Sequence, residues 1–284
     1  MSEPAMHISS HHAMATEFQV RIAGEENTYA AQTAQAAFAL TDELEKLLSR
    51  FRSSSDICQC ARLAPGEILR LSEPVFACLE IAKKMELATR GAFSISAAAL
   101  QSQPALPRWT LLRDQFSIRC ESGKLEFDLG AIGKGFALDR MAEVLREWSC
   151  ESFLLVAGGS SILAGNAPAG TAGWLCGLAD DHSPRRYRLK NCSLSGSGLA
   201  VKGPHIFDPR TGKPALRQNR AWALSETAAE SDALSTACMV LDEAELSEIF
   251  LNQSGSFVWL QDGEEWKEFG DLKLWVDKAV CNSN

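Results

Sequence analysis

Strand-like and helical patterns of apolar residues follow one another irregularly along this 284-residue chain, and no segment repeats. Apolar positions with helical period mark residues 30–51, 73–90 and 133–148, whereas 15–23, 152–157, 174–179, 187–196 and 220–226 have the length and composition of strands. A further helix is expected around residues 227–240. This order predicts an α+β or mixed α/β fold in a single domain over 14–284, with mixed or antiparallel sheets and packed helices.

Turn residues add detail to this prediction. Asp262-Gly263 between two strand-like arms predicts a β-hairpin, and Glu121-Ser122-Gly123 predicts a second one joining 116–120 to 124–130. Residues 101–114 hold prolines and no clean period, so we expect a surface loop there. Residues 1–13 have no apolar core, and we expect a disordered, solvated lead-in.

Charge and cysteine content exclude several classes of protein. A net charge of −8 argues against a general nucleic-acid or anionic-membrane binder. No apolar run reaches membrane-spanning length, so no membrane insertion is expected. Nine scattered cysteines, an odd number, favour reduced and mostly buried thiols. Together with an N-terminus that lacks a secretory signal, they predict a cytoplasmic protein.

Asp232-Ala-Leu-Ser-Thr236 carries a carboxylate and a hydroxyl four residues apart in a predicted helix. At that spacing both side chains leave the same face of a helix, with Ser235 beside them. Hard oxygen ligands suit Mg²⁺ or Ca²⁺ better than zinc. The alternative is that Asp232 lies near a helix start and caps backbone N–H groups.

Other segments place glycine, serine and charged residues at strand ends. In residues 127–139 a strand precedes Gly133-Lys134-Gly135, where glycines allow a close backbone approach and a helix N-terminus offers an anion site. The alternative for this segment is a tight turn with a solvated lysine. Residues 156–166 and 193–198 are rich in glycine and serine. In residues 205–214, a turn follows His205, a side chain suited to proton transfer.

In this order, DLGAIGKGFALD, VAGG, SGSG, HIFDPRTGKP and DALSTA resemble the motifs of the ApbE-type FAD:protein FMN transferases, from about Met14 to Val240. The resemblance implies a T-fold-like α+β domain that binds FAD and one or two Mg²⁺ ions. Members of the family move FMN from FAD onto a Thr or Ser hydroxyl of an acceptor protein and release AMP.

Residue roles follow from the resemblance by position. The metal ligands implied are the Ala131 carbonyl, Asp232 and Thr236, with Ser235 as a weaker candidate. The implied FAD contacts are Met14, Phe51, Ala92, Phe93, Ser94, Asp128, Lys134 and Ile206. His205 is the candidate base for the acceptor hydroxyl.

The chain also departs from the family pattern. Ser94 and Ser197 stand where aspartates are usual, Ala15 stands for a glycine, and Ala61 for an asparagine. Each change removes polar contact or adds bulk near the expected ligand. The alternatives are therefore an FAD pyrophosphatase that releases FMN and AMP, an FAD-binding or carrier protein without turnover, and a globular protein whose motifs are relics of the fold.

Overall fold

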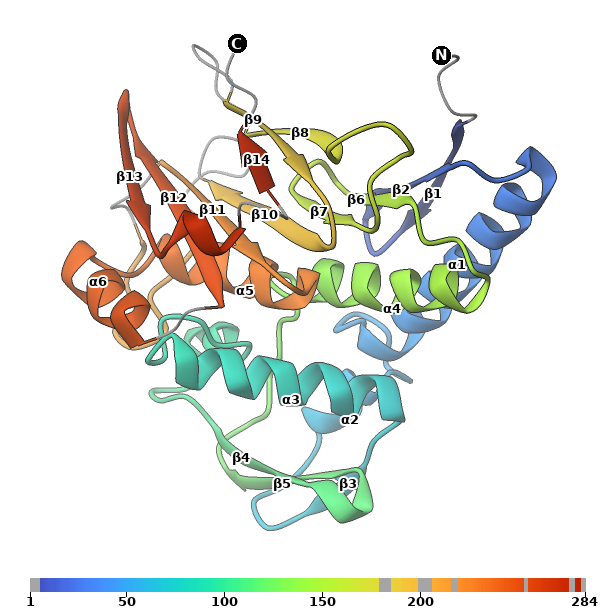
Figure 1. The fold of residues 1–284 in the computed structure, drawn as a ribbon. Helices are drawn as coiled ribbons and strands as arrows, with labels where there is room; N and C mark the ends of the chain where they lie inside the picture. The colour runs from blue at the N-terminus through green and yellow to red at the C-terminus, as the bar shows by residue number, and fades with distance from the viewer. Residues whose placement is uncertain are drawn as a thin grey trace.

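The protein has an α+β architecture built on one large antiparallel sheet (Figure 1). The computed structural model describes residues 6–178, 185–198, 206–215, 219–252, 255–275 and 279–281. Its eight-stranded sheet has the order β1-β2-β6-β7-β10-β11-β12-β13. Every strand pairing among the described residues is antiparallel, which confirms the predicted fold class.

The elements have the following bounds. The strands of the large sheet are β1 (Met6–Ala13), β2 (Thr16–Ala23), β6 (Phe153–Ala157), β7 (Ser161–Ala164), β10 (Cys192–Gly198), β11 (Arg220–Ser225), β12 (Ser256–Asp262) and β13 (Glu265–Phe269). The other strands are β3 (Ile68–Arg70), β4 (Arg108–Leu112), β5 (Ser117–Ser122), β8 (Trp174–Leu178), β9 (Arg185–Leu189) and β14 (Ala279–Cys281). The α-helices are α1 (Asn27–Leu48), α2 (Asp56–Cys60), α3 (Glu73–Ala88), α4 (Gly133–Glu147), α5 (Ala228–Cys238) and α6 (Glu243–Asn252).

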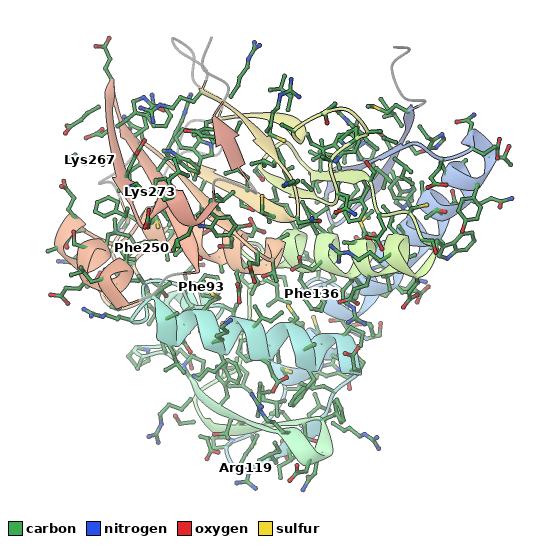
Figure 2. The ribbon with its side chains drawn as sticks, viewed as in Figure 1. Phe93, Arg119, Phe136, Phe250, Lys267 and Lys273 are labelled. Carbon is green, nitrogen blue, oxygen red and sulfur yellow. The ribbon has the colours of Figure 1, made fainter. Side chains whose placement is uncertain are left out.

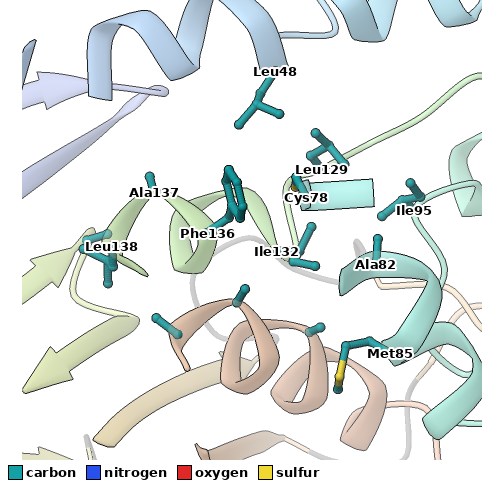
Figure 3. Packing of buried hydrophobic residues seen from close by; sticks show 14 of the residues in the cluster. Leu48, Cys78, Ala82, Met85, Ile95, Leu129, Ile132, Phe136, Ala137 and Leu138 are labelled. Atoms are coloured by element: carbon teal, nitrogen blue, oxygen red, sulfur yellow. The ribbon is translucent and has the colours of Figure 1, made fainter. Parts of the chain in front are cut away.

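Helices α1, α4 and α5 cover one face of the large sheet (Figure 1). Helix α5 packs on β10 and β11, α4 on β6 and β7, and α1 on β1 and β2. Helix α3 packs below this layer, against α5 and α1. Figure 3 shows the core that results, with Phe136 of α4 projecting toward Leu48 of α1, and with Ile132 between Phe136 and Ala82 of α3. Figure 2 shows how side chains fill the space between α3 and the layer above it.

A second apolar cluster lies on the opposite face of the sheet. The small sheet β14-β9-β8 packs there, and the cluster includes Trp174, Trp222, Trp259 and Trp275. Residues 153–157 read as a continuous apolar run because β6 is buried on both faces: Leu155 belongs to the helix-side cluster and Leu154 to this one. A third sheet, β3-β5-β4, lies beyond α3 at the far end of the molecule (Figure 1).

Several sequence predictions need correction. Residues 6–13 are not a disordered lead-in: they form β1, which pairs with β2 over its whole length. Residues 116–130 do not form a hairpin, because both edges of β5 are already taken by β3 and β4. The expected loop at 101–114 contains strand β4. Residues 187–196 form parts of two strands, β9 and β10, separated at Asn191. The predicted hairpin at Asp262-Gly263 is confirmed as β12–β13.

The described cysteines agree with the expected reduced state. Eight of them are free thiols, and all except Cys58 are buried. Burial raises the pKa of Cys60, Cys78 and Cys176 to about 12, so these thiols stay protonated and are poor nucleophiles. None of the helices in the described ranges is both long and apolar enough to cross a membrane.

Candidate functional site

Helices α4 and α5 cap each other at their N-termini. Asp232, inside α5, accepts a hydrogen bond from the Gly135 backbone N–H at the start of α4 (3.2 Å). Asp139, inside α4, accepts from the Ala228 and Ala229 N–H groups at the start of α5 (2.7 and 2.8 Å). Thr227 is the N-cap of α5 itself, so Asp232 does not cap its own helix. The alternative that Asp232 caps a backbone N–H group holds for the start of α4 instead.

Gly135 makes this arrangement possible. A Cβ at this position would lie 2.1 Å from the Ala228 carbonyl oxygen, so only glycine lets the two helix starts approach so closely. The sequence suggested that glycines in this segment admit a ligand. At Gly135 the close approach is instead made by the backbone of α5, which brings Asp232 against the N-terminus of α4.

Asp232 is a buried carboxylate with a full set of partners. It is only 2% exposed. Its Oδ1 accepts from Ser161 Oγ (3.1 Å), and the Lys134 ammonium donates to both Oδ1 and Oδ2 (3.2 and 3.0 Å). A buried charge requires such compensation. Lys134 is therefore not a solvated lysine, and the alternative that the sequence offered for it is wrong.

Hydroxyl groups continue the polar site along α5. Ser235 Oγ and Thr236 Oγ1 both donate to the Asp232 carbonyl (3.0 and 3.2 Å). Ser197 Oγ, from β10, lies 3.0 Å from Ser235 Oγ and 3.2 Å from Thr236 Oγ1. The structure thus brings the Ser235 and Thr236 hydroxyls together with Ser197, beside the Asp232 backbone carbonyl. The Asp232 carboxylate itself contacts Lys134, Gly135 and Ser161.

These oxygens are chemically suited to a hard divalent cation. The described residues contain no cluster of three or more His, Cys, Asp or Glu side chains that could hold a metal. A cation here would depend on one carboxylate, hydroxyls and backbone carbonyls, which is a donor set of the kind Mg²⁺ accepts. The cation that the structure places at this carboxylate is the Lys134 ammonium, which contacts Asp232 (3.0 Å) and the Gly130 carbonyl (3.3 Å), next to the predicted ligand Ala131.

A continuous chain of contacts leads from Asp232 to an exposed aromatic ring. Lys134 reaches Gly130, whose N–H donates to Asp128 Oδ1 (2.9 Å). Asp128 Oδ2 lies 3.0 Å from Arg50 Nη1, and the Arg50 guanidinium stands 4.9 Å from the ring centre of Phe51. Phe51 is 83% exposed, which is unusual for so large an apolar side chain.

The segment 92–94 packs beside this chain. Ala92 and Phe93 are buried in the core and present no side chain to solvent. Ser94 donates to Glu86 on α3 (2.7 Å), and the Asp128 N–H donates to the Ile95 carbonyl (2.7 Å). A ligand here would meet Ser94 or backbone atoms rather than the side chains of its two neighbours.

Residues 206–215 form a turn held by an ion-pair clamp. Ile206 is buried, and its carbonyl accepts from the Ala215 N–H (2.9 Å). Arg210 pairs with Asp208 within the turn and with Glu245 on α6. These two carboxylates raise the pKa of Arg210 and hold its charge in place. The predicted base His205 precedes this turn and lies outside the described residues.

Met14 lies in the turn between β1 and β2. Both turn residues have positive φ, 50° for Met14 and 57° for Ala15. Ala15, which replaces the glycine of the family pattern, thus adopts a conformation that favours glycine. The turn borders the Gly158 turn, where a Cβ would lie 2.3 Å from Thr16 Oγ1. The serine that follows this second turn, Ser161, contacts Asp232.

Sequence reasoning missed three participants, Arg50, Asp139 and Ser161, and it named Ser197 only as a departure from the family pattern. Ser161 and Ser197 lie in the glycine- and serine-rich segments 156–166 and 193–198, and Asp139 is the last residue of the DLGAIGKGFALD motif. Arg50 directly precedes Phe51, but nothing in its neighbourhood in the sequence indicates its ion pair with Asp128, 78 positions away.

Comparison with known proteins gives a consistent answer. The ApbE family model matches residues 14–257. FAD:protein FMN transferase from Klebsiella pneumoniae is 24% identical over 216 residues, covering 64% of this chain and 66% of the relative. The enzyme of that name from Treponema pallidum is 29% identical over 146 residues, covering 44% of this chain and 40% of the relative.

Solved structures show the same fold at lower identity. The ApbE protein from Thermotoga maritima superposes with a TM-score of 0.81 at 20% identity, covering 95% of this chain and 99% of that one. Flavin transferase ApbE from Vibrio cholerae gives 0.80 at 17% identity, covering 94% and 97%. With a family match that spans most of the sequence and a shared fold, the chain belongs to the ApbE family.

Proposed function

We propose that this protein is a metal-dependent FAD:protein FMN transferase that moves FMN from FAD onto a Thr or Ser hydroxyl of an acceptor protein and releases AMP. The observation that carries the proposal is the buried Asp232, set among oxygen ligands and joined by contacts to the exposed Phe51. The names of the relatives support the same activity.

Asp232, Thr236 and the Ala131 carbonyl, with Ser235 beside them, would hold one or two Mg²⁺ ions. The metal, when bound, would polarise phosphoryl oxygens and offset the charge of the FAD diphosphate. The N-terminus of α4 adds a positive dipole end on the same side. These are the requirements of phosphoryl transfer, in which positioning and charge neutralisation dominate.

FAD would extend from this centre toward Phe51. The exposed ring offers a stacking face to the flavin or the adenine. Asp128, Lys134 and Ser94 offer polar contacts, whereas Ala92, Phe93, Met14 and Ile206 would contribute backbone atoms or the packing behind them. Buried Ala92 and Phe93 hold the backbone of this segment in place.

His205 is our candidate general base. In the step that we propose, the acceptor hydroxyl oxygen bonds to the FMN phosphorus, the bond from that phosphorus to the bridging oxygen breaks, and AMP leaves. The hydroxyl proton passes to His205. The Arg210 clamp on Asp208 and Glu245 fixes the turn that follows this histidine.

The test is a mass measurement. The protein is incubated with FAD, Mg²⁺ and candidate acceptor domains, and the acceptor is examined for an FMN mass addition while AMP is quantified. Asp232→Ala should abolish both products, whereas Asp114→Ala, which removes an exposed carboxylate, should keep them. Circular dichroism checks that both variants fold. Absence of adduct and AMP with all acceptors would contradict the proposal.

FAD hydrolysis is the second candidate, and Ser197 favours it. A serine instead of the family's aspartate lies against Thr236 and Ser235, so the site has one fewer negative charge with which to hold its metal. Release of FMN and AMP without an adduct, abolished by Asp232→Ala, would identify this activity. Tight binding of intact FAD would identify a carrier instead.

The partners proposed are FAD and an acceptor protein with a Thr or Ser target. We also propose a cytoplasmic location, which the eight free thiols support because such cysteines persist in reducing compartments. The single domain stays a prediction, but its start at residue 14 is wrong, because β1 (Met6–Ala13) belongs to the same sheet.

A further inference from the structure

The Lys134 ammonium occupies a position of the kind that a metal ion takes. It donates to three oxygens: both carboxylate oxygens of Asp232 (3.0 and 3.2 Å) and the Gly130 carbonyl (3.3 Å). The side chain of Asp232 is 3% exposed and that of Lys134 is 23% exposed. The lysine thus covers the open side of the buried carboxylate.

The other contacts of Asp232 are neutral. Ser161 Oγ and the Gly135 N–H donate to it, and neither carries a formal charge. Among the described residues that contact this carboxylate, Lys134 is therefore the one that balances its charge. Without a cation at this place, a buried Asp232 would be strongly destabilising.

A divalent ion and this ammonium compete for the same two carboxylate oxygens. Mg²⁺ binds its oxygen ligands directly, at about 2.0–2.1 Å, and keeps a near-octahedral shell. An ammonium held within hydrogen-bond distance of the same two oxygens would be repelled by the ion and would block part of that shell. Binding of the ion therefore weakens the hold of Asp232 on the ammonium.

Lys134 is also poorly placed on its own helix. It is the second residue of α4, at the positive end of the helix dipole, where a cation is disfavoured. Its interaction with Asp232 holds it there. Once Asp232 has another counter-ion, the ammonium gains by moving to a nearby anion.

We propose that Lys134 is an internal counter-cation that a divalent metal displaces from Asp232, and that the released ammonium then binds the diphosphate of the dinucleotide. This inference rests on the metal-dependent function proposed above. It makes Lys134 a positioning residue that couples the two ligands: metal binding frees the group that FAD needs, so each ligand strengthens the binding of the other.

The first experiment measures metal affinity in the absence of FAD. Binding of Mn²⁺, a spectroscopic substitute for Mg²⁺, is followed by electron paramagnetic resonance in wild type, Lys134→Met and Lys46→Met. Lys46 is a half-exposed lysine paired with Glu43 on α1, so its variant removes one charge away from the site. We expect Lys134→Met to bind Mn²⁺ about tenfold tighter or more, a change within the range of measured couplings, and Lys46→Met to match wild type.

Flavin fluorescence then gives FAD affinity with and without Mg²⁺. The enhancement by Mg²⁺ should be several-fold smaller in Lys134→Met than in wild type. Unchanged or weaker Mn²⁺ binding by a folded Lys134→Met would overturn the inference. So would a wild-type protein that binds no divalent ion, whatever the result of the FMN-transfer assay.

A second measurement uses the wild-type protein, so it does not depend on the stability of a variant. Lysine acetylation is quantified by mass spectrometry, with Lys46 as internal standard. Lys134 should react slowly in the free protein, several-fold faster with Mg²⁺ alone, and slowly again with Mg²⁺ and FAD. Protection or no change on adding Mg²⁺ alone would overturn the inference. If Mg²⁺ exposes Lys134 but no FMN is transferred, the inference about Lys134 is supported and the proposed transferase activity is contradicted.

Discussion

Ser197 adjoins two of the predicted metal-ligating hydroxyl groups, and the family pattern has an aspartate at this place. Its Oγ lies 3.0 Å from Ser235 Oγ and 3.2 Å from Thr236 Oγ1. Ser197→Asp would add a second carboxylate to the oxygen set around Asp232. Because the affinity of oxygen sites for hard cations rises with ligand charge, we expect Mn²⁺ to bind about tenfold tighter. Titration calorimetry measures the change.

Ser197→Asn is the matched control, because it has nearly the same shape as aspartate but no charge. Its metal affinity should stay near that of wild type. Equal gains in the two variants would mean that the shape of the side chain, and not its charge, changes the site.

Phe51 leads to a prediction about FAD. Phe51→Ala removes the exposed ring that stands beside Arg50 and Asp128. Stacking of an aromatic side chain on a base contributes about 1–3 kcal/mol, so FAD should bind roughly 5- to 150-fold more weakly. Fluorescence titration gives the value. The control is Phe116→Ala, which truncates another exposed phenylalanine, next to the far sheet β3-β5-β4. A loss of the same size in both variants would contradict the role given to Phe51.

At the scale of elements, the crossed N-termini of α4 and α5 bury an acid whose protonation depends on folding. Burial raises the pKa of Asp139 to about 7, against the opposing effect of two backbone N–H donors, and Glu230 and Glu143 raise it further. The unfolded-state value is near 3.8. Between these values the folded protein keeps a proton that the unfolded chain has lost. The free energy of unfolding therefore falls as pH rises through this window, by on the order of a few kcal/mol.

Asp139→Asn should remove this dependence. The amide keeps one acceptor for α5 but turns its NH₂ group toward the second N–H, so at pH 5, where wild type keeps the proton, the variant is less stable by roughly 1–2 kcal/mol. This difference should shrink as the pH rises, because only wild type loses stability. Between pH 5 and 8, urea unfolding should show a smaller decline for the variant than for wild type. Parallel curves would mean that Asp139 is already ionised in the folded protein at pH 5.

The helices and strands that the sequence predicted correctly are those with a clear pattern of apolar or turn residues within the segment itself. Helices α1, α3 and α4 have an apolar face in the sequence, and the β12–β13 hairpin has a defined turn. Strand β1 escaped prediction because it lies at the edge of the large sheet and is largely polar. The second expected hairpin failed because β3, more than 40 residues earlier in the chain, takes one edge of β5.

The residues of the candidate site could be predicted from the sequence, but the contacts between them could not. Asp232, Thr236, Lys134 and Ala131 stand in recognisable motifs, yet the bond between Lys134 and Asp232 joins positions 98 apart. It depends on the close crossing of α4 and α5 at Gly135, which is a property of the packed helices. Local sequence patterns do not specify such a crossing.

At the scale of the whole molecule, the large sheet separates two apolar clusters, one on each face, and contributes residues to both. In β11, Ala221 and Ala223 belong to the helix-side cluster, and Trp222 and Leu224 belong to the other. Strand β6 alternates in the same way. Each cluster packs against side chains of the large sheet, so neither stays buried when the sheet unfolds. Loss of either cluster should therefore unfold the other.

We therefore expect a single cooperative unfolding transition. Tryptophan fluorescence reports largely on the cluster opposite the helices, which holds Trp174, Trp222, Trp259 and Trp275, whereas far-UV circular dichroism reports largely on the helices. The two signals should give the same urea midpoint and the same slope. The site joins a helix to the large sheet, since Asp232 on α5 contacts Ser161 on β7, and Mg²⁺ with FAD should therefore shift both signals together. A tryptophan transition that precedes the helical one would show instead that the small sheet β14-β9-β8 and its cluster unfold independently.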